Sequence, residues 1–177
     1  MTNVSIIVTC EEQETELRKL LPDLLSQQYG GDYEVIVVDM KHDKDLEEWL
    51  ENMEAQYSYL SHTFCPTSSR GIDPHKLALT LAAKAAINEW VIILPVYTEL
   101  QNKEWLINLA SNINDQIDVV IQAQKKKRHW NIFKKIFRPA FSIFRPTSSI
   151  ILCRRNILLE AKTNIPKKRI IKLPAKL

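Results

Sequence analysis

The chain has 177 residues, of which 45% are hydrophobic and 25% are charged. This length supports one hydrophobic core, and this composition is typical of a globular protein, so we expect a single domain. No apolar run reaches the roughly 18 residues of a membrane-spanning helix, and the start of the chain lacks the pattern of a secretory signal. We therefore expect a cytoplasmic protein without a transmembrane helix.

The three cysteines and three glycines exclude several kinds of site. Cys10, Cys65 and Cys153 are scattered and form no CxxC pair, which argues against a zinc site or a disulfide framework. We expect them to be buried free thiols. With only three glycines, neither a GxGxxG turn nor a P-loop can be written, so Rossmann cofactor binding and Walker-type ATP chemistry are not expected.

Charge divides the chain into two parts. Residues 1–124 hold 8 Lys and Arg against 20 Asp and Glu, a net charge of −12, whereas residues 125–177 hold 16 against 1, a net charge of +15. We expect residues 1–124 to form the folded α/β unit and residues 125–177 to be a basic C-terminal segment. Such an asymmetry indicates an anionic partner for the basic part, or its docking on the acidic part.

The first elements predict a β-α-β unit. Residues 4–8 and 34–39 are apolar runs rich in β-branched residues, typical of strands that are buried on both faces of a parallel sheet. A helix between them is predicted to end at the glycine signal of residues 29–32. Its apolar face is formed by leucines spaced three and four residues apart, namely Leu17, Leu20, Leu21, Leu24 and Leu25.

Further elements alternate in the same way. A helix is predicted near residues 44–56 and a weakly indicated strand near 57–64, followed by an irregular loop over 65–74. Pro74 lies near the start of a long helix, and residues 89–95 predict a buried strand. The last elements of the acidic part are a helix near 103–113 and a strand over 118–124. This order predicts an α/β layered fold with a mostly parallel central sheet.

The basic part begins with an aromatic stretch over residues 125–145, which is broken at Pro139. Residues 149–153 predict a last strand, followed by a short helical stretch and a frayed or extended terminus. The residues of the stretch that could contact a membrane or another anionic partner are Lys125, Lys126, Lys127, Arg128, Trp130, Phe133, Lys134, Lys135 and Phe137.

Three interpretations of this aromatic stretch stay open. It could be an interfacial helix on an anionic membrane, with aromatic side chains among the headgroups. It could neutralise nucleic-acid phosphates, which we consider the least favoured of the three. It could also close the core with its aromatic side chains while the basic ones lie in solvent. The first would place the protein at the inner face of the membrane.

Several blocks resemble family 2 glycosyltransferases, which have the GT-A fold. They are VSIIV, the leucine-patterned helix, DYEVIVVD, and KLALTLAAKAAINEW with its following strand, and together they cover roughly residues 4–110. The resemblance implies a nucleotide-sugar-binding domain with a Rossmann-like layered architecture. It also implies transfer of a sugar, of the hexosyltransferase type, from a nucleotide-sugar to a glycan or lipid-linked acceptor.

One motif of that family is missing. In the family, the strand equivalent to residues 89–95 ends in Asp-x-Asp, which holds Mn²⁺ or Mg²⁺ on the sugar diphosphate. Here the chain reads Pro95, Val96 and Tyr97, and none of these can replace a carboxylate at a metal. Residues 9–13, TCEEQ, also differ from the family's PVYNE-like loop. We therefore expect no metal cofactor and an impaired or inactive transferase, or else a non-catalytic binding module with a basic tail.

Four residues are candidates for roles in the resembled site. Asp39 stands where the family has an Asp that reads the base or ribose, although it could instead be a capping or loop residue. Arg70 and Lys76 could bind phosphate together with a helix N-terminus, or could simply be solvated. Glu160 is the one acidic residue of 125–177 and thus the candidate general base there, with a solvated helix residue as the alternative. No catalytic residue can be assigned.

Overall fold

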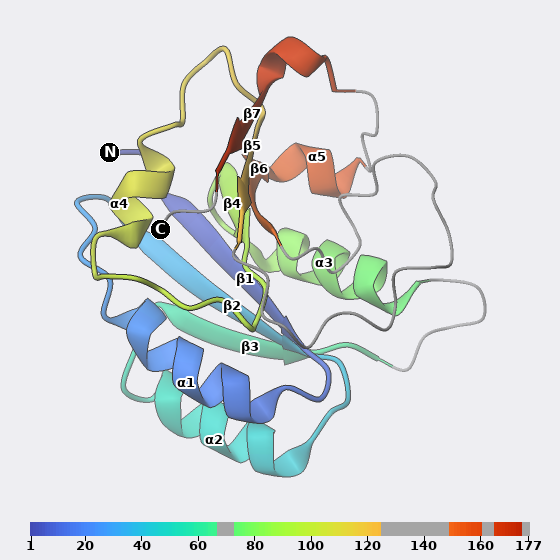
Figure 1. Ribbon diagram of the computed structural model, residues 1–177. Helices are drawn as coiled ribbons and strands as arrows, with labels where there is room; N and C mark the ends of the chain where they lie inside the picture. The colour runs from blue at the N-terminus through green and yellow to red at the C-terminus, as the bar shows by residue number, and fades with distance from the viewer. Residues whose placement is uncertain (67–72, 125–148, 161–164, 175–177) are drawn as a thin grey trace.

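The structure is a computed structural model that describes residues 1–66, 73–124, 149–160 and 165–174 (Figure 1). Its strands are β1 (Val4–Cys10), β2 (Tyr33–Asp39), β3 (Leu60–Phe64), β4 (Trp90–Ile93), β5 (Val119–Ala123), β6 (Ser149–Arg154) and β7 (Ile170–Leu173). Its helices are α1 (Glu14–Leu25), α2 (Lys44–Glu54), α3 (Pro74–Ala85), α4 (Trp105–Ala110) and α5 (Arg155–Leu159), with a 3₁₀ turn η1 (Lys167–Arg169).

All seven strands belong to one sheet with the order β3-β2-β1-β4-β6-β5-β7. β1 is parallel to both β2 and β4, and its register with β2 runs from the pair Val4 and Tyr33 to the pair Cys10 and Asp39. β6 is antiparallel to both of its neighbours, β4 and β5. The sheet is therefore mixed but mostly parallel, as the alternation of strands and helices predicts.

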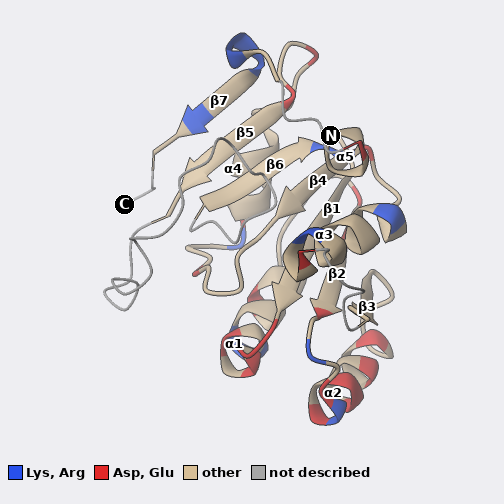
Figure 2. Ribbon diagram, turned by 90° about the vertical axis from the view of Figure 1, so that its right-hand side faces the viewer, with Lys and Arg blue, Asp and Glu red and all other residues tan. Residues whose placement is uncertain are grey.

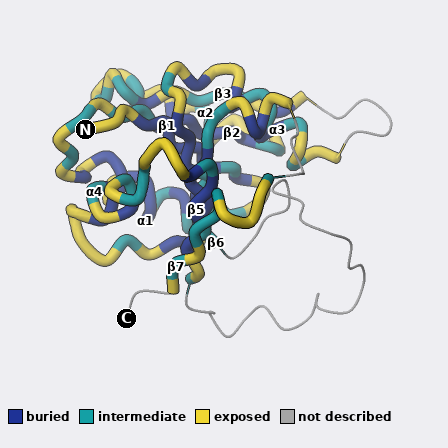
Figure 3. Tube along the Cα trace, turned by 90° about the horizontal axis from the view of Figure 1, so that it is seen from above, coloured by how far each residue is buried: buried dark blue, intermediate teal, exposed yellow. Residues whose placement is uncertain are grey.

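Helices cover both faces of the sheet, and each face has its own hydrophobic core (Figure 1). The leucines of α1, which repeat every three to four residues, pack on one face together with α2 and α4. The small residues of α3, such as Ala78 and Ala82, pack closely on the other face with α5. Figure 3 shows the strands as the buried centre and the outer helix surfaces as exposed. Burial on both faces explains why β1 and β2 are continuous apolar runs.

The predicted end of the first helix is wrong. α1 ends at Leu25, before the glycine signal at residues 29–32. Its last carbonyl groups accept hydrogen bonds from tyrosine hydroxyls, since Tyr59 Oη donates to Leu25 O at 2.7 Å and Tyr33 Oη donates to the same oxygen at 3.2 Å. These hydroxyls come from residues 8 and 34 positions beyond Leu25, outside the helix, and they satisfy a carbonyl group that a glycine cap would otherwise serve.

The C-terminal part contributes more to the sheet than the sequence predicts. Residues 149–153 do form a strand, β6, but it is not the last one and it lies between β4 and β5. The terminus is extended, and its residues 170–173 form β7, which pairs in parallel with β5. Residues 125–148, with the predicted aromatic stretch, lie outside the described residues. Within the described ranges, none of the helices has both the length and the apolar character needed to cross a membrane.

Candidate functional site

A cavity of about 290 Å³ lies where β1 and β2 end. Cys10 and Asp39, the last residues of these strands, are register partners and lie side by side. The cavity is lined by Cys10, Glu11, Glu12, Glu14, Asp39, Lys41, Asp43 and Leu46. In open α/β sheets the carboxyl ends of the strands are the usual place for a ligand, so this cavity is the candidate site.

Asp39 is positioned at this edge, and its carboxylate closes the loop that follows β2. The side chain is only 3% exposed. Its Oδ1 accepts a hydrogen bond from the Lys41 amide at 2.8 Å, and its Oδ2 accepts one from the Asp43 amide at 2.7 Å. The loop contacts that the sequence left open as an alternative role for Asp39 are therefore present in the structure.

Two other carboxylates of the cavity form ion pairs. Glu12 accepts a short hydrogen bond from Lys41 Nζ, and this bond lowers the pKa of Glu12 below its ordinary value. Glu14 Oε1 lies 2.6 Å from Arg18 Nη2, one helical turn further along α1. Both pairs are partly or largely exposed, so they shape the rim of the cavity and contribute little to stability.

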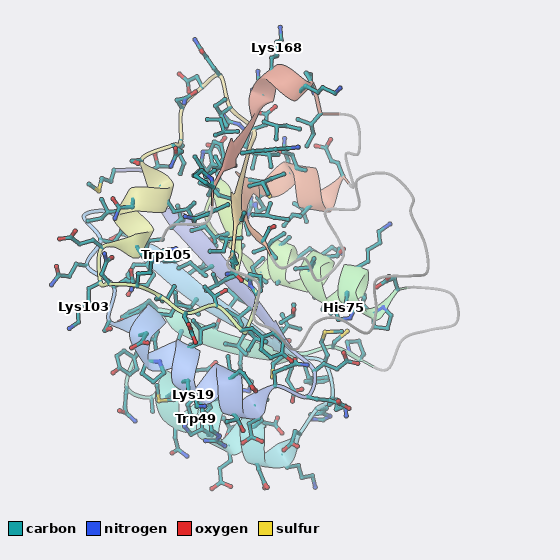
Figure 4. The ribbon with its side chains drawn as sticks, in the orientation of Figure 1. Lys19, Trp49, His75, Lys103, Trp105 and Lys168 are labelled. Carbon is teal, nitrogen blue, oxygen red and sulfur yellow. The ribbon has the colours of Figure 1, made fainter. Side chains whose placement is uncertain are left out.

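The remaining carboxylates of the cavity also have partners. Asp43 Oδ1 is the N-cap of α2 and accepts hydrogen bonds from the amides of Asp45 and Leu46 at 2.9 and 3.3 Å. Glu11 Oε2 lies 3.9 Å from Nε2 of His75, which belongs to the first turn of α3 (Figure 4). This contact places the start of α3 beside the cavity.

At the end of β4 the chain makes a tight turn that is held by a threonine. Leu94 N donates to Ile7 O at 2.9 Å, which is the last bond between β4 and β1. Thr98 then closes the turn, because its amide and its hydroxyl donate to Pro95 O at 2.9 and 2.5 Å. Gln124 Nε2, just after β5, donates to the same hydroxyl at 2.5 Å. Thr98 and Gln124 thus fix this turn, and no sequence pattern pointed to either of them.

The residues at the end of β4 do not fit a divalent metal ion. Pro95 and Val96 have no side-chain ligand, and Tyr97 is 44% exposed and offers only a neutral phenol. Among the residues that the structure describes, no group of three or more His, Cys, Asp or Glu side chains could hold a metal ion. The carboxylates of the cavity are already engaged in caps, loop contacts and ion pairs.

The predicted phosphate-binding residues are only partly described. Lys76 is exposed in the first turn of α3, and its amide donates to the N-cap side chain of Asp73 at 3.2 Å, as does the amide of His75 at 2.9 Å. An anion at this helix end would therefore compete with Asp73. Arg70 lies outside the described residues, and so does every predicted membrane-contact residue from Lys125 to Phe137.

Glu160 follows helix α5, which does not begin at the edge of the sheet where the cavity lies. α5 begins where β6 pairs with the first residue of β4, at the edge of the sheet opposite to the cavity. Glu160 follows α5 as its exposed C-cap residue. The general-base role for this residue stays a prediction that the geometry does not favour.

Cys10 forms part of the cavity wall as a protonated thiol. It is 1% exposed, and burial raises the pKa of its thiol to about 11. Burial likewise raises the pKa of Cys153 to about 12. The three cysteines are free and buried, as the sequence predicts, and thiols with such pKa values are poor nucleophiles at neutral pH.

Sequence reasoning missed an aromatic pair beside the cavity. The rings of His42 and Phe64 are stacked, with centroids 4.4 Å apart and an interplanar angle of 12°. Phe64 is the last residue of β3 and the register partner of Asp39. His42 lies between Lys41 and Asp43, both of which line the cavity. The two rings are 22 residues apart along the chain, so no local spacing could have linked them.

Solved structures of glycosyltransferases resemble this chain. Residues 1–349 of TarS from S. aureus are 22% identical over 99% of this chain and 60% of that one, with a TM-score of 0.65. PcManGT, a mannosyltransferase from Pyrobaculum calidifontis, is 18% identical over 97% and 54%, with a TM-score of 0.69. Glucosyl-3-phosphoglycerate synthase from Mycobacterium tuberculosis is 14% identical over 98% and 68%, with a TM-score of 0.67.

The chain thus spans little more than half the length of the first two of these structures. No protein-family model matches the sequence, and neither does any curated protein sequence. Identities of 14 to 22% show a shared architecture. The sheet, the two helical layers and these likenesses together show that the chain has the GT-A fold of glycosyltransferases.

Proposed function

We propose that the chain is a degenerate family 2-type glycosyltransferase domain that binds the nucleotide part of a nucleotide-sugar without metal-assisted sugar transfer. The observation that supports the proposal is the β4 end, where Pro95, Val96 and Tyr97 stand at the position for which the family resemblance implies metal-binding carboxylates. Without a cation on the diphosphate, the leaving group loses several kcal/mol of stabilisation. In an intact member, the sugar would pass to a glycan or lipid-linked acceptor.

Two features support retained nucleotide binding. The cavity lies at the strand ends where this architecture holds its ligands, and Asp39 lines it at the end of β2, where the family resemblance implies an Asp that reads the nucleoside. Structurally similar proteins were solved with UDP-GlcNAc, in TarS, and with GDP-Man and Mn²⁺, in PcManGT. UDP- and GDP-sugars are therefore the donor classes to test.

Isothermal titration with UDP-GlcNAc and GDP-mannose is expected to show binding that is equal with and without Mn²⁺. The physical reason is that the β4 end offers no ligand for the cation. The matched variant carries Pro95→Asp and Tyr97→Asp, which returns two carboxylates to this position. We expect Mn²⁺ to tighten donor binding at least about tenfold in this variant and not in the wild type.

Two results would contradict the proposal. Tighter donor binding by the wild type in Mn²⁺ would show that other residues hold the cation. No heat with any UDP- or GDP-sugar would show that the fold is used without a donor, and would favour the non-catalytic scaffold.

The charge distribution supports a second candidate function, which is docking on an anionic membrane. The basic segment 125–177 carries a net charge of +15. Figure 2 shows Asp and Glu concentrated on α1 and α2, and Lys and Arg on η1 and β7 at the far edge of the sheet. Basic residues close to an anionic bilayer contribute roughly 1 kcal/mol each. An anionic surface would therefore attract the basic edge of the sheet and repel the acidic helices α1 and α2.

Flotation with vesicles that contain phosphatidylserine tests this candidate. We expect the wild type to float, and a Lys134→Glu, Lys135→Glu variant to float several-fold less. Its control is Lys19→Glu with Lys103→Glu, because these exposed lysines of the acidic part give the same change in net charge (Figure 4). Equal flotation of all three proteins would show that the basic segment does not guide binding.

A further inference from the structure

We propose that the aromatic platform, defined as His42 and Phe64, stacks against the nucleobase of a nucleotide-sugar, and that Asp39 acts as the residue that positions this platform. The inference rests on the proposed function and names the residues that would hold the base. It assigns Asp39 an indirect role, in place of the direct contact with the base or ribose that the family resemblance implies.

The two rings of the platform are more exposed to solvent than the packing of the fold requires. Phe64 is 47% exposed, and the His42 side chain is 52% exposed. An aromatic ring at the end of a strand gains more stability by packing into the core than by stacking on a loop histidine at the surface. Large exposed aromatic rings beside a cavity are typical of ligand sites, where a rigid flat surface receives a planar group.

Asp39 builds the platform through the backbone. Its two carboxylate oxygens accept hydrogen bonds from the amides on either side of His42, those of Lys41 and Asp43. The loop is thereby closed so tightly that His42 takes a φ of 57°, the one non-glycine residue with positive φ among those described. Side chains rarely adopt this conformation, and departures of this kind cluster at ligand sites. The closed loop turns the imidazole onto Phe64.

Charge around the platform selects the part of the ligand that can lie there. Glu47 Oε2 is 3.6 Å from His42 Nε2, and Asp39 and Asp43 lie on the adjacent cavity wall. A diphosphate would be repelled by these carboxylates, whereas an uncharged ring would not. Stacking of a base on an aromatic side chain accepts any base, because every base has a π-face. The platform therefore fits the nucleoside end of the donor, with the phosphates directed away from it.

The test measures binding of uncharged nucleosides, which removes the phosphate contribution. Uridine and guanosine are titrated into the wild type and into the variants Phe64→Ala and His42→Gly, with detection by saturation-transfer NMR. Glycine accepts the positive φ of residue 42, so this variant removes the ring without disturbing the loop. Ile87→Ala is the matched control, because Ile87 is 77% exposed and lies by the cavity at the opposite edge of the sheet.

We expect nucleoside affinity to fall roughly tenfold to a hundredfold in Phe64→Ala and in His42→Gly, and to be unchanged in Ile87→Ala. Equal affinity in all four proteins overturns the platform. Donor binding by UDP-GlcNAc that is unaffected by both ring deletions overturns the platform and leaves the proposed function intact. Failure of nucleosides, nucleotides and nucleotide-sugars alike to bind the wild type overturns both.

Discussion

Replacing Asp39 by alanine is expected to lower the free energy of unfolding by about 3 kcal/mol, because two hydrogen bonds to a buried charged acceptor are lost. The variant leaves the amides of Lys41 and Asp43 without their acceptor, and the loop between them opens. Asp39→Asn keeps one acceptor oxygen and should cost about half as much. Urea unfolding followed by circular dichroism gives both values.

Lys41→Ala is the matched control for this loop. It keeps the backbone amide that donates to Asp39 and removes only the exposed side-chain pair with Glu12. Its urea midpoint should stay close to that of the wild type. If Asp39→Ala unfolds at the same urea concentration as Lys41→Ala, the carboxylate does not hold the loop, and the positioning role of Asp39 is wrong as well.

Asp118→Asn is expected to destabilise the chain by about 2 kcal/mol, because Asp118 fastens β7 to the rest of the sheet. The Asp118 carboxylate accepts two hydrogen bonds from Arg169, from Nε at 2.5 Å and from Nη2 at 2.6 Å. Arg154 Nε donates to it at 3.2 Å. The carboxylate thus joins the end of β6 to the last residue of η1, directly before β7, and the Asp118 side chain is only 19% exposed. Thermal unfolding measures the loss.

The stabilising contribution of Asp118 decreases at low pH. The hydrogen bond from Arg169 lowers the pKa of Asp118 below its ordinary value of 3.8. A carboxyl whose pKa is lower in the folded state stabilises it fully above 3.8, and the benefit is lost as the pH falls through the folded-state value. The difference in stability between the wild type and Asp118→Asn should therefore be constant near neutral pH and shrink below pH 3.8.

Asp115→Asn provides the comparison for Asp118, because Asp115 is exposed and contacts Arg169 only through its backbone oxygen. Its unfolding temperature should match that of the wild type across the whole pH range. An Asp118→Asn protein that shows the same acid dependence as the wild type would mean that other carboxyl groups govern stability at low pH.

The strands of the sheet were predicted correctly where they depend on residues close together in the sequence. The apolar runs at 4–8 and 34–39 became β1 and β2 because strands buried on both faces need no alternation. The position of Asp39 at the sheet edge followed from the same pattern. The place of β6 could not be predicted, since it depends on pairing with β4, which lies more than 50 residues earlier.

Most contacts of the candidate site likewise could not be predicted from sequence patterns. That residues 95–97 carry no carboxylate could be read directly from the sequence, and the resemblance alone implies that carboxylates would stand there. The roles of Thr98 and Gln124 in the turn were not, since their contact joins the ends of two strands that are not neighbours in the sheet. The stack of His42 on Phe64 goes with a left-handed backbone conformation at His42, which only a few per cent of non-glycine residues adopt, so the sequence did not predict it at this position.

The position of β6 between β4 and β5 has a consequence for synthesis on the ribosome. When residue 124 has been added, β3, β2, β1 and β4 can already pair, but β5 has no neighbour, because its partners are β6 and β7. The growing chain must carry an open β4 edge until residues 149–154 emerge. A nascent chain that stops within this interval would expose the unpaired edge of β4, to which another chain could pair. Chaperones would therefore be needed most at this stage of synthesis.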